Sequence, residues 1–172
     1  MTERESLARI RSFYGEFLAK AAKLHRHRPE VLAGIMQRET EGGLSRYLSE
    51  KGAAGMGDGG NGMGLMQIDR RSFPEFYKSG GWKSPDQNIH FAAFVLADKR
   101  AYVVSHTLTM GLSDAEIERA AIASYNCGQG NVMKALRNGD DVDSFTAHKN
   151  YSAEVLRLAE IYRGIANLPD VA

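Results

Sequence analysis

A glutamate continues the apolar face of a predicted helix in the first quarter of the chain. Leu32, Ile35 and Met36 recur at the three- and four-residue spacing of one helix face, and Glu39 falls on the same stripe. Apolar surroundings and the negative end of the helix dipole both disfavour an ionised carboxyl, and the glycine pair that follows is expected to end the helix. We therefore predict that the pKa of Glu39 is raised, as a general acid requires.

Two aspartates lie in or just after the glycine-rich stretch GAAGMGDGGNGMGLMQID, residues 52–69. The density of glycine predicts no regular helix or strand before Gly64. Asp58 and Asp69 in such a polar loop are expected to stay ionised and to hold water. Hydrolysis of a glycosidic bond needs one protonated carboxyl for the leaving oxygen and one carboxylate for the water. Glu39 and these two aspartates have the residue types for both roles.

Three segments, in chain order, resemble the signature segments of goose-type lysozymes. They are RET at residues 38–40, GMGDGGNGMGLMQID at residues 55–69 and SYNCGQGNV at residues 124–132. The resemblance is nearly ungapped through the glycine loop and extends over residues 31–162. It implies one lysozyme-like catalytic domain over residues 1–172, of the α+β class and predominantly α, with a small irregular or β segment beside the cleft.

The resemblance also implies an activity and its catalytic residues. A goose-type enzyme cleaves the β-1,4 bond between N-acetylmuramic acid and N-acetylglucosamine of peptidoglycan, with Glu39 as the acid and Asp58 and Asp69 holding the attacking water. An inverting mechanism follows from that arrangement. Two alternatives stay open, because lytic transglycosylases share the fold and yield 1,6-anhydromuropeptides, and a non-catalytic module could bind the same polymer. The carboxyl of Glu39 on an apolar helix face argues against a non-catalytic binding module, which would have no use for it.

A second group of residues is predicted to bind the glycan. The predicted substrate-binding residues are Gln67, His90, Tyr125, Asn126 and Tyr151. For Tyr125 and Asn126 the alternative is a core tyrosine and a helix cap, but their match to the family's YN pair favours the cleft. For His90 the alternative is a buried histidine bonded to a backbone group. The chain departs from the family at Phe73, where a histidine is frequent, so no role is carried over to that position.

Composition limits the other functions that the chain could have. The length of 172 residues suits one sizeable core, and the net charge of +1 argues against an extended nucleic-acid surface. The single cysteine, Cys127, cannot form an intramolecular disulfide and is expected to fill the core. We expect no cofactor and no metal, no stable membrane insertion, and a monomer. The expected partners are peptidoglycan glycan strands and a protein lysozyme inhibitor.

The first residues, MTERESLARIRS, carry charges where a secretory signal needs an apolar core. An enzyme of the cell wall would then act in the periplasm or outside the cell after cytoplasmic synthesis and release by another route, as phage endolysins do. A leader removed from the chain is the other possibility.

The predicted elements that position these side chains are mostly helices. Helical spacing is expected over residues 7–24, 29–39, 88–104, 113–125, 131–137 and 151–165. The first has Leu7, Ile10, Phe13 and Leu24 on its apolar face, whereas residues 88–104 are apolar nearly all round, which is typical of a helix surrounded by others.

Two connecting segments are expected to lack regular structure. Residues 70–86 contain two prolines and a glycine pair and are predicted to form an irregular connection. Its aromatic residues Phe76, Tyr77 and Trp82 could anchor the segment or stack on sugar rings. The acidic segment GDDVDS, residues 139–144, lacks the pattern of a calcium loop and is predicted to be a solvated turn.

Overall fold

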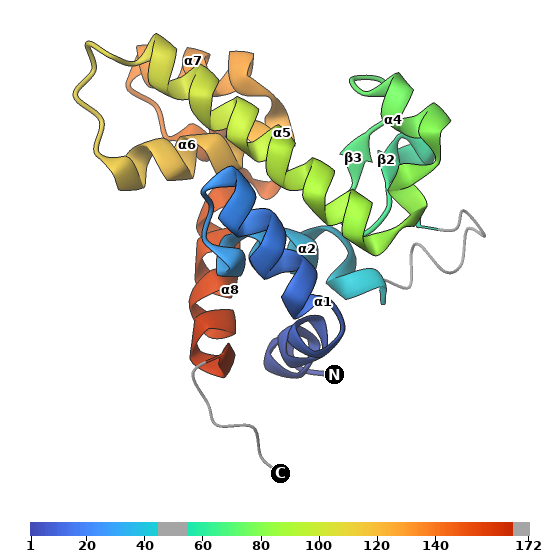
Figure 1. Cartoon of the computed structure of the whole chain (residues 1–172). Helices are drawn as coiled ribbons and strands as arrows, with labels where there is room; N and C mark the ends of the chain where they lie inside the picture. Colours follow the sequence, from blue (N-terminus) through green and yellow to red (C-terminus); the bar gives the residue numbers. More distant parts are fainter. Residues whose placement is uncertain (45–54, 167–172) are drawn as a thin grey trace. The chain divides into compact units, whose positions relative to one another are not determined.

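The computed structural model describes residues 1–44 and 55–166, which fall into two compact units. Unit 1 comprises Met1–Ala93 and Leu158–Ala172, and unit 2 comprises Phe94–Arg157. Helices predominate, and the described residues form one small antiparallel sheet, in unit 1 (Figure 1). No helix in the described ranges is both long and apolar enough to cross a membrane. The prediction of a single domain stays a prediction.

Unit 1 contains the sheet and the N-terminal helices. Its helices are α1 (Glu3–His25), α2 (Pro29–Thr40), α4 (Pro74–Ser79) and the beginning of α5 (Pro85–His106), with short 3₁₀ helices η1 (Glu41–Gly43), η2 (Asp58–Gly60) and η3 (Gly81–Lys83). Its strands are β1 (Met56–Gly57), β2 (Gly62–Met63) and β3 (Ile68–Asp69). The end of α8 (Tyr151–Ala166) also belongs to it.

Unit 2 contains the end of α5, the acidic segment of residues 139–144 and the beginning of α8. Its other elements are α6 (Asp114–Cys127), α7 (Gln129–Asn138), η4 (Val142–Phe145) and η5 (Ala147–Lys149). The predicted start of α6 is confirmed, because Ser113 and Glu116 form a reciprocal capping box. The predicted face of α8 is also confirmed, since Tyr151, Val155 and Leu158 are all buried.

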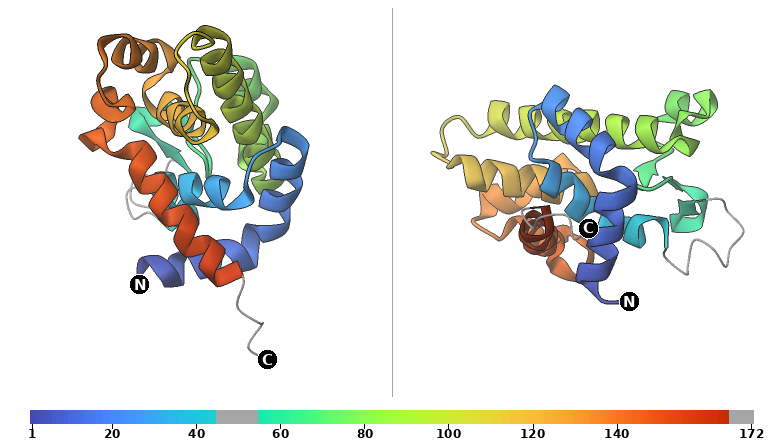
Figure 2. Two further views of the ribbon diagram at one scale, coloured as in Figure 1. Left: turned by 90° about the vertical axis from the view of Figure 1, so that its left-hand side faces the viewer. Right: turned by 60° about the horizontal axis from the view of Figure 1, so that its bottom comes forward.

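Helices α1 and α2 pack side by side in unit 1 (Figure 2). A buried hydrogen bond joins them, in which Ser6 Oγ donates to Gln37 Oε1 over 2.6 Å. The buried stripe of α1 includes Leu7 and Ile10, as predicted, but Phe13 and Leu24 are exposed. That part of the prediction was wrong because both residues lie at the margin of the buried stripe, where helical spacing alone does not decide burial.

The glycine-rich stretch forms strands, which corrects the prediction that none occurs before Gly64. The three two-residue strands pair in the order β1-β2-β3, with Gly57 opposite Gly62 and Gly62 opposite Asp69. Because each strand is so short, the loss of side-chain packing at glycine costs little. The predicted small β segment is therefore present, although residues 52–54 of it lie outside the described residues.

The connection after β3 is not wholly irregular, because α4 lies within it. Pro74 occupies the first turn of α4, and Gly80 ends the helix in the left-handed conformation, with φ of 73°. Proline at the start and glycine after the end are typical helix boundaries. The prediction counted both residues as loop signals, and this accounts for the error.

Helix α5 starts at Pro85 and includes the predicted residues 88–104. Ile89, Ala92 and Leu96 are buried, but Phe94 and Val104 are exposed. The prediction that α5 is covered all round was therefore wrong. An apolar composition on every face does not by itself require neighbours on every face.

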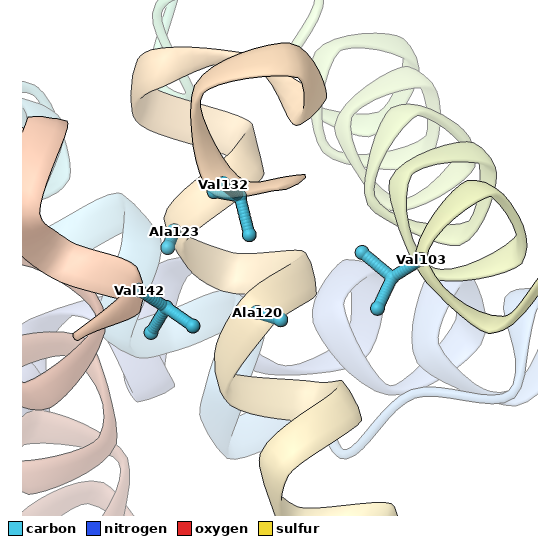
Figure 3. Packing of buried hydrophobic residues seen from close by; sticks show 5 residues of the cluster. All are labelled: Val103, Ala120, Ala123, Val132 and Val142. Carbon is cyan, nitrogen blue, oxygen red and sulfur yellow. The ribbon is translucent and has the colours of Figure 1, made fainter. Parts of the chain in front are cut away.

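The core of unit 2 is a cluster of small aliphatic side chains. It brings together Val103 of α5, Ala120 and Ala123 of α6, Val132 of α7 and Val142 of η4 (Figure 3). Cys127 is partly buried against this cluster, in keeping with its predicted packing role. Burial is the main cause that raises the pKa of the Cys127 thiol, so this cysteine is a poor nucleophile.

Candidate functional site

Glu39 lies in the last turn of α2 and is half-buried. Its neighbours on the predicted stripe, Leu32, Ile35 and Met36, are fully buried, so Glu39 lies at the solvent-facing end of an apolar face. The helix ends at the next residue, Thr40, one residue before the left-handed Glu41. The raised pKa of Glu39 stays a prediction.

Thr40 ties the end of α2 to the glycine-rich loop. Its buried hydroxyl donates to the carbonyl of Leu65 over 2.8 Å and accepts from the amide of Gly43 over 3.1 Å. These bonds hold the backbone next to Glu39 against the segment that leads to Asp69. Sequence reasoning missed this role, although a threonine directly after the motif glutamate at a helix end was a signal for it.

Asn88, near the start of α5, holds the same loop from its other side. The amide of Met66 donates to Asn88 Oδ1 over 2.9 Å, and Asn88 Nδ2 donates to the carbonyl of Met63 over 3.1 Å. A side chain at Gly64 would place its Cβ 2.5 Å from Asn88 Nδ2 and 2.6 Å from the carbonyl of Trp82. Glycine is therefore required at position 64, where φ is also +69°. The signal available in the sequence was an asparagine at the start of a strongly apolar predicted helix.

The side chain of Gln67, a predicted substrate ligand, is engaged within the loop. Its Nε2 donates to the carbonyls of Gly55 and Gly64, over 3.0 and 2.8 Å. A Cβ at position 62 would lie 2.2 Å from Gln67 Oε1, so a larger residue there would displace the Gln67 side chain. The observed role of Gln67 is thus to fasten the turn between β2 and β3, and its contact with substrate stays a prediction.

Asp58 and Asp69 both contact one arginine that the sequence reasoning did not single out. Arg71 Nε donates to Asp69 Oδ1 over 2.9 Å, and Arg71 Nη2 lies 3.5 Å from Asp58 Oδ2. The second oxygen of Asp69 accepts from the amide and hydroxyl of Ser72, over 3.1 and 2.7 Å. The structure therefore brings the two predicted aspartates together around a shared cation.

This environment favours the ionised form of Asp69. Burial is the largest single influence and acts to raise the pKa, but the hydrogen bonds from Ser72 and Arg71, with the charge of Arg71, outweigh it. The pKa of Asp69 is consequently lower than usual. Asp58 has a left-handed backbone, with φ of 48°, and its carbonyl accepts from the amide of Asn61 over 3.1 Å.

The aromatic residues after β3 contact other rings of the protein. Phe76 stacks on Phe91 of α5 with ring centroids 4.0 Å apart, and Phe73 meets the same ring edge-on. Trp82 is buried. Tyr77, which stacks on Trp82, keeps 37% of its surface exposed. The anchoring alternative thus describes Phe76 and Trp82, whereas Tyr77 has surface left for a sugar ring.

His90 is exposed and is not the buried histidine considered as an alternative. Its ring meets that of His25 of α1 edge-on, with centroids 4.8 Å apart. Burial lowers the pKa of His25, and the charge of His90 adds to that effect. The substrate-binding role of His90 stays a prediction.

The remaining predicted glycan ligands belong to unit 2. Tyr125 and Asn126 lie in the last turn of α6, where Tyr125 is half-buried and Asn126 is exposed. Asn126 Oδ1 accepts from the amide of Ala147 over 2.9 Å, so this side chain fastens the start of η5. Tyr151 is the first residue of α8 and is almost fully buried. Glu39, Asp58, Asp69, Gln67 and His90 all belong to unit 1.

A second carboxylate cluster forms within the segment 139–144, which was predicted to be a solvated turn. Asp143 is buried, and its carboxylate accepts from the amide and hydroxyl of Ser152 over 2.9 and 2.7 Å. The amide of Ala153 and the hydroxyl of Thr146 donate to it as well. Residues 139–141 are exposed as predicted, but the prediction was wrong for Asp143, which caps the N-terminus of α8, a pairing that local composition does not reveal. No group of three or more potential metal ligands occurs within the described ranges.

Comparisons with known proteins agree with these motifs. The family model described as Lysozyme g matches residues 4–165. Lysozyme g of Casuarius casuarius is 31% identical over 135 residues, which cover 78% of this chain and 64% of that protein. Lysozyme g of Gallus gallus is 31% identical over 78% of this chain and 56% of its own length. Lysozyme g of Cyprinus carpio is 28% identical over 87% of this chain and 72% of its own length.

Proposed function

The chain belongs to the lysozyme g family, and from this premise we propose that it is a peptidoglycan hydrolase. The reaction is cleavage of the β-1,4 bond between N-acetylmuramic acid and N-acetylglucosamine. The chain spans less than two thirds of the length of the bird relatives it matches, so the proposal depends on the chain's own site. The observation that carries it is the junction at Thr40, which joins the helix of Glu39 to the loop of Asp58 and Asp69.

In the proposed mechanism Glu39 protonates the leaving glycosidic oxygen. Its place at the end of an apolar helix face, beside the C-terminal end of the dipole, supports retention of its proton. Asp58 and Asp69 hold the attacking water and take its proton. An inverting enzyme needs roughly 6.5–9.5 Å between acid and base, so that the water fits on the opposite face of the sugar.

The Asp58–Arg71–Asp69 cluster supports a hydrolase rather than a lytic transglycosylase. A transglycosylase needs no second carboxylate, because the 6-hydroxyl of the sugar attacks the anomeric carbon and closes a 1,6-anhydro ring. A second carboxylate site in the cleft is needed when water is the nucleophile, and the lowered pKa of Asp69 suits a base that accepts the proton of that water. We accordingly expect reducing-end muramic acid products of inverted configuration.

Mass spectrometry of digested peptidoglycan, with Glu39→Gln as the inactive variant, tests the proposal. Loss of the general acid should reduce lysis by about 10²–10⁴-fold while leaving the melting temperature unchanged or slightly higher. The matched control is Glu75→Gln, at an exposed glutamate of unit 1 that pairs with Lys78. Hydrolysis products are one water heavier than anhydro products. Predominantly anhydromuropeptides, or near-full lysis by folded Glu39→Gln, would contradict the proposal.

The substrate implies where the protein acts and what it meets. Peptidoglycan lies in the cell wall, so the proposed site of action is outside the cytoplasmic membrane. Glycan strands are the proposed partner, with a protein lysozyme inhibitor as a second, and the proposed active form is a monomer.

A further inference from the structure

We propose that Arg71 is a positioning residue that holds Asp58 and Asp69 together as one water-binding pair. The inference rests on the proposed hydrolase function and extends it to a residue outside the predicted site. Arg71 follows β3 by two residues and points its guanidinium at both carboxylates. Its distances to them are 2.9 Å from Nε to Asp69 and 3.5 Å from Nη2 to Asp58.

The sheet explains why a forked cation is needed here. Gly57, which precedes Asp58, and Asp69 lie on the two outer strands, with Gly62 of β2 between them. Asp58 itself lies in η2, the turn that follows β1, so the two carboxylates are carried by backbones of different elements. Neighbouring strands of the sheet are about 4.8 Å apart. A guanidinium presents donors on different nitrogens and can contact two carboxylates at once, whereas a lysine offers a single charged point.

The two aspartates have unequal roles in this arrangement. Both oxygens of Asp69 are engaged, one by Arg71 and the other by Ser72. Within residues 1–44 and 55–166, the ion pair of Asp58 is with Arg71 alone, and 72% of its side chain is exposed. Asp69 therefore anchors the arginine, and the arginine in turn holds Asp58, whose lone pairs remain available to water.

Arg71 also offsets the repulsion between the two negative charges. Like charges that share a site raise each other's pKa, and a cation between them opposes this. The side chain of Arg71 is 66% exposed, so the effect is screened by salt and should weaken as ionic strength rises.

The kinetic test compares Arg71→Gln and Arg71→Lys with wild type. The matched control is Lys78→Gln, which removes an exposed positive charge elsewhere in unit 1. We expect Arg71→Gln to lower kcat about tenfold with KM within about twofold. The acidic limb of its pH profile should move to higher pH by about half a unit to one unit, because that limb reports the base. Arg71→Lys should restore the acidic limb but only part of kcat, and Lys78→Gln should match wild type.

A second measurement is independent of activity. Carbon-13 NMR titration of the aspartate carboxyls in wild type and Arg71→Gln requires no substrate, and the Asp69 resonance should titrate at higher pH in the variant. Identical titrations, or kcat within about twofold of wild type in the folded variant, would overturn the proposal. If Arg71→Gln does not fold, wild-type kcat in Arg71→Lys would overturn it instead. If wild type fails to cleave peptidoglycan, the proposed function fails, but the NMR titration still decides the role of Arg71.

Discussion

Arg71 in unit 1 and Arg119 in unit 2 each contact two aspartates, yet the two clusters differ in the burial and the hydrogen-bond partners of their carboxylates. Arg119 Nη2 lies 2.7 Å from Asp141 and 3.4 Å from Asp143, distances similar to those around Arg71. The side chain of Asp143, however, is only 2% exposed, against 35% for Asp69. Residue types alone would have classed the two clusters together.

The difference lies in what else donates to the carboxylates. Asp143 accepts from the amides of Ser152 and Ala153 in the first turn of α8, where the helix dipole also favours a negative charge. The oxygens of Asp143 are thus occupied by hydrogen bonds from within the protein. Asp58 belongs to short strands and turns and keeps most of its carboxylate in solvent. An aspartate–arginine cluster is therefore structural when helix amides fill its oxygens and available for chemistry when solvent does.

The largest expected effect is on stability, at the buried cluster. Asp143→Ala should lower the free energy of unfolding by about 3 kcal/mol, because it removes a helix cap and leaves buried donors without an acceptor. For a chain of this size the melting temperature should fall by roughly 6–12 °C. The control is Asp140→Ala, at an exposed aspartate three residues earlier. An unchanged melting temperature in Asp143→Ala would contradict the structural role of the buried cluster.

The next effect is on activity, at the exposed cluster. The double variant that carries Asp58→Asn and Asp69→Asn should lyse a cell-wall suspension about 100-fold more slowly than wild type, because it lacks the general base. Either single substitution should leave residual activity. The melting temperature of the double variant should stay close to that of wild type, since both groups are at the surface. A large loss of stability in the double variant would show that this cluster too is structural.

Acid unfolding should separate the clusters by their dependence on pH. Burial acts to raise the pKa of Asp143, but hydrogen bonds from Ser152, Ala153 and Thr146 together hold it below the usual 3.8. A carboxyl with a lowered folded-state pKa contributes stability that is present above its unfolded pKa and is lost as pH falls through the folded value. Thermal melts from pH 7 to pH 2 should show this loss in wild type and in Asp69→Asn. Asp143→Asn should have lower stability at pH 7 and a flatter pH dependence.

The smallest effect comes from deleting one hydroxyl at each cluster. Ser152→Ala removes a buried donor to Asp143 and should cost about 1 kcal/mol. Ser72→Ala removes the equivalent donor to Asp69 at an exposed position and should change stability by less than about 0.5 kcal/mol. Chemical denaturation of both variants measures the difference, and equal losses would contradict the contrast in burial.

The sequence could predict those features that depend on neighbours along the chain. The spacing of residue types within a few helical turns predicted three such features. They are helix α2 with Glu39 in its last turn, the capping box of α6 and the buried face of α8. The three motif segments also indicated the family, which the match over residues 4–165 shows. Such features are determined locally because a helix satisfies its backbone hydrogen bonds within itself.

Only the tertiary structure decided the contacts between segments that are distant in sequence. Three contacts depend on backbones that the fold brings together from different elements. They are the hydrogen bonds of Asn88 with Met63 and Met66, the ion pair of Arg71 with Asp58, and the hydrogen bonds of Asp143 at the start of α8. Aspartates lie beside a paired sheet in the glycine-rich segment and form a buried helix cap in residues 139–144. Burial and hydrogen-bond partners, which set the role of a carboxylate, are properties of the folded neighbourhood and not of the residue type.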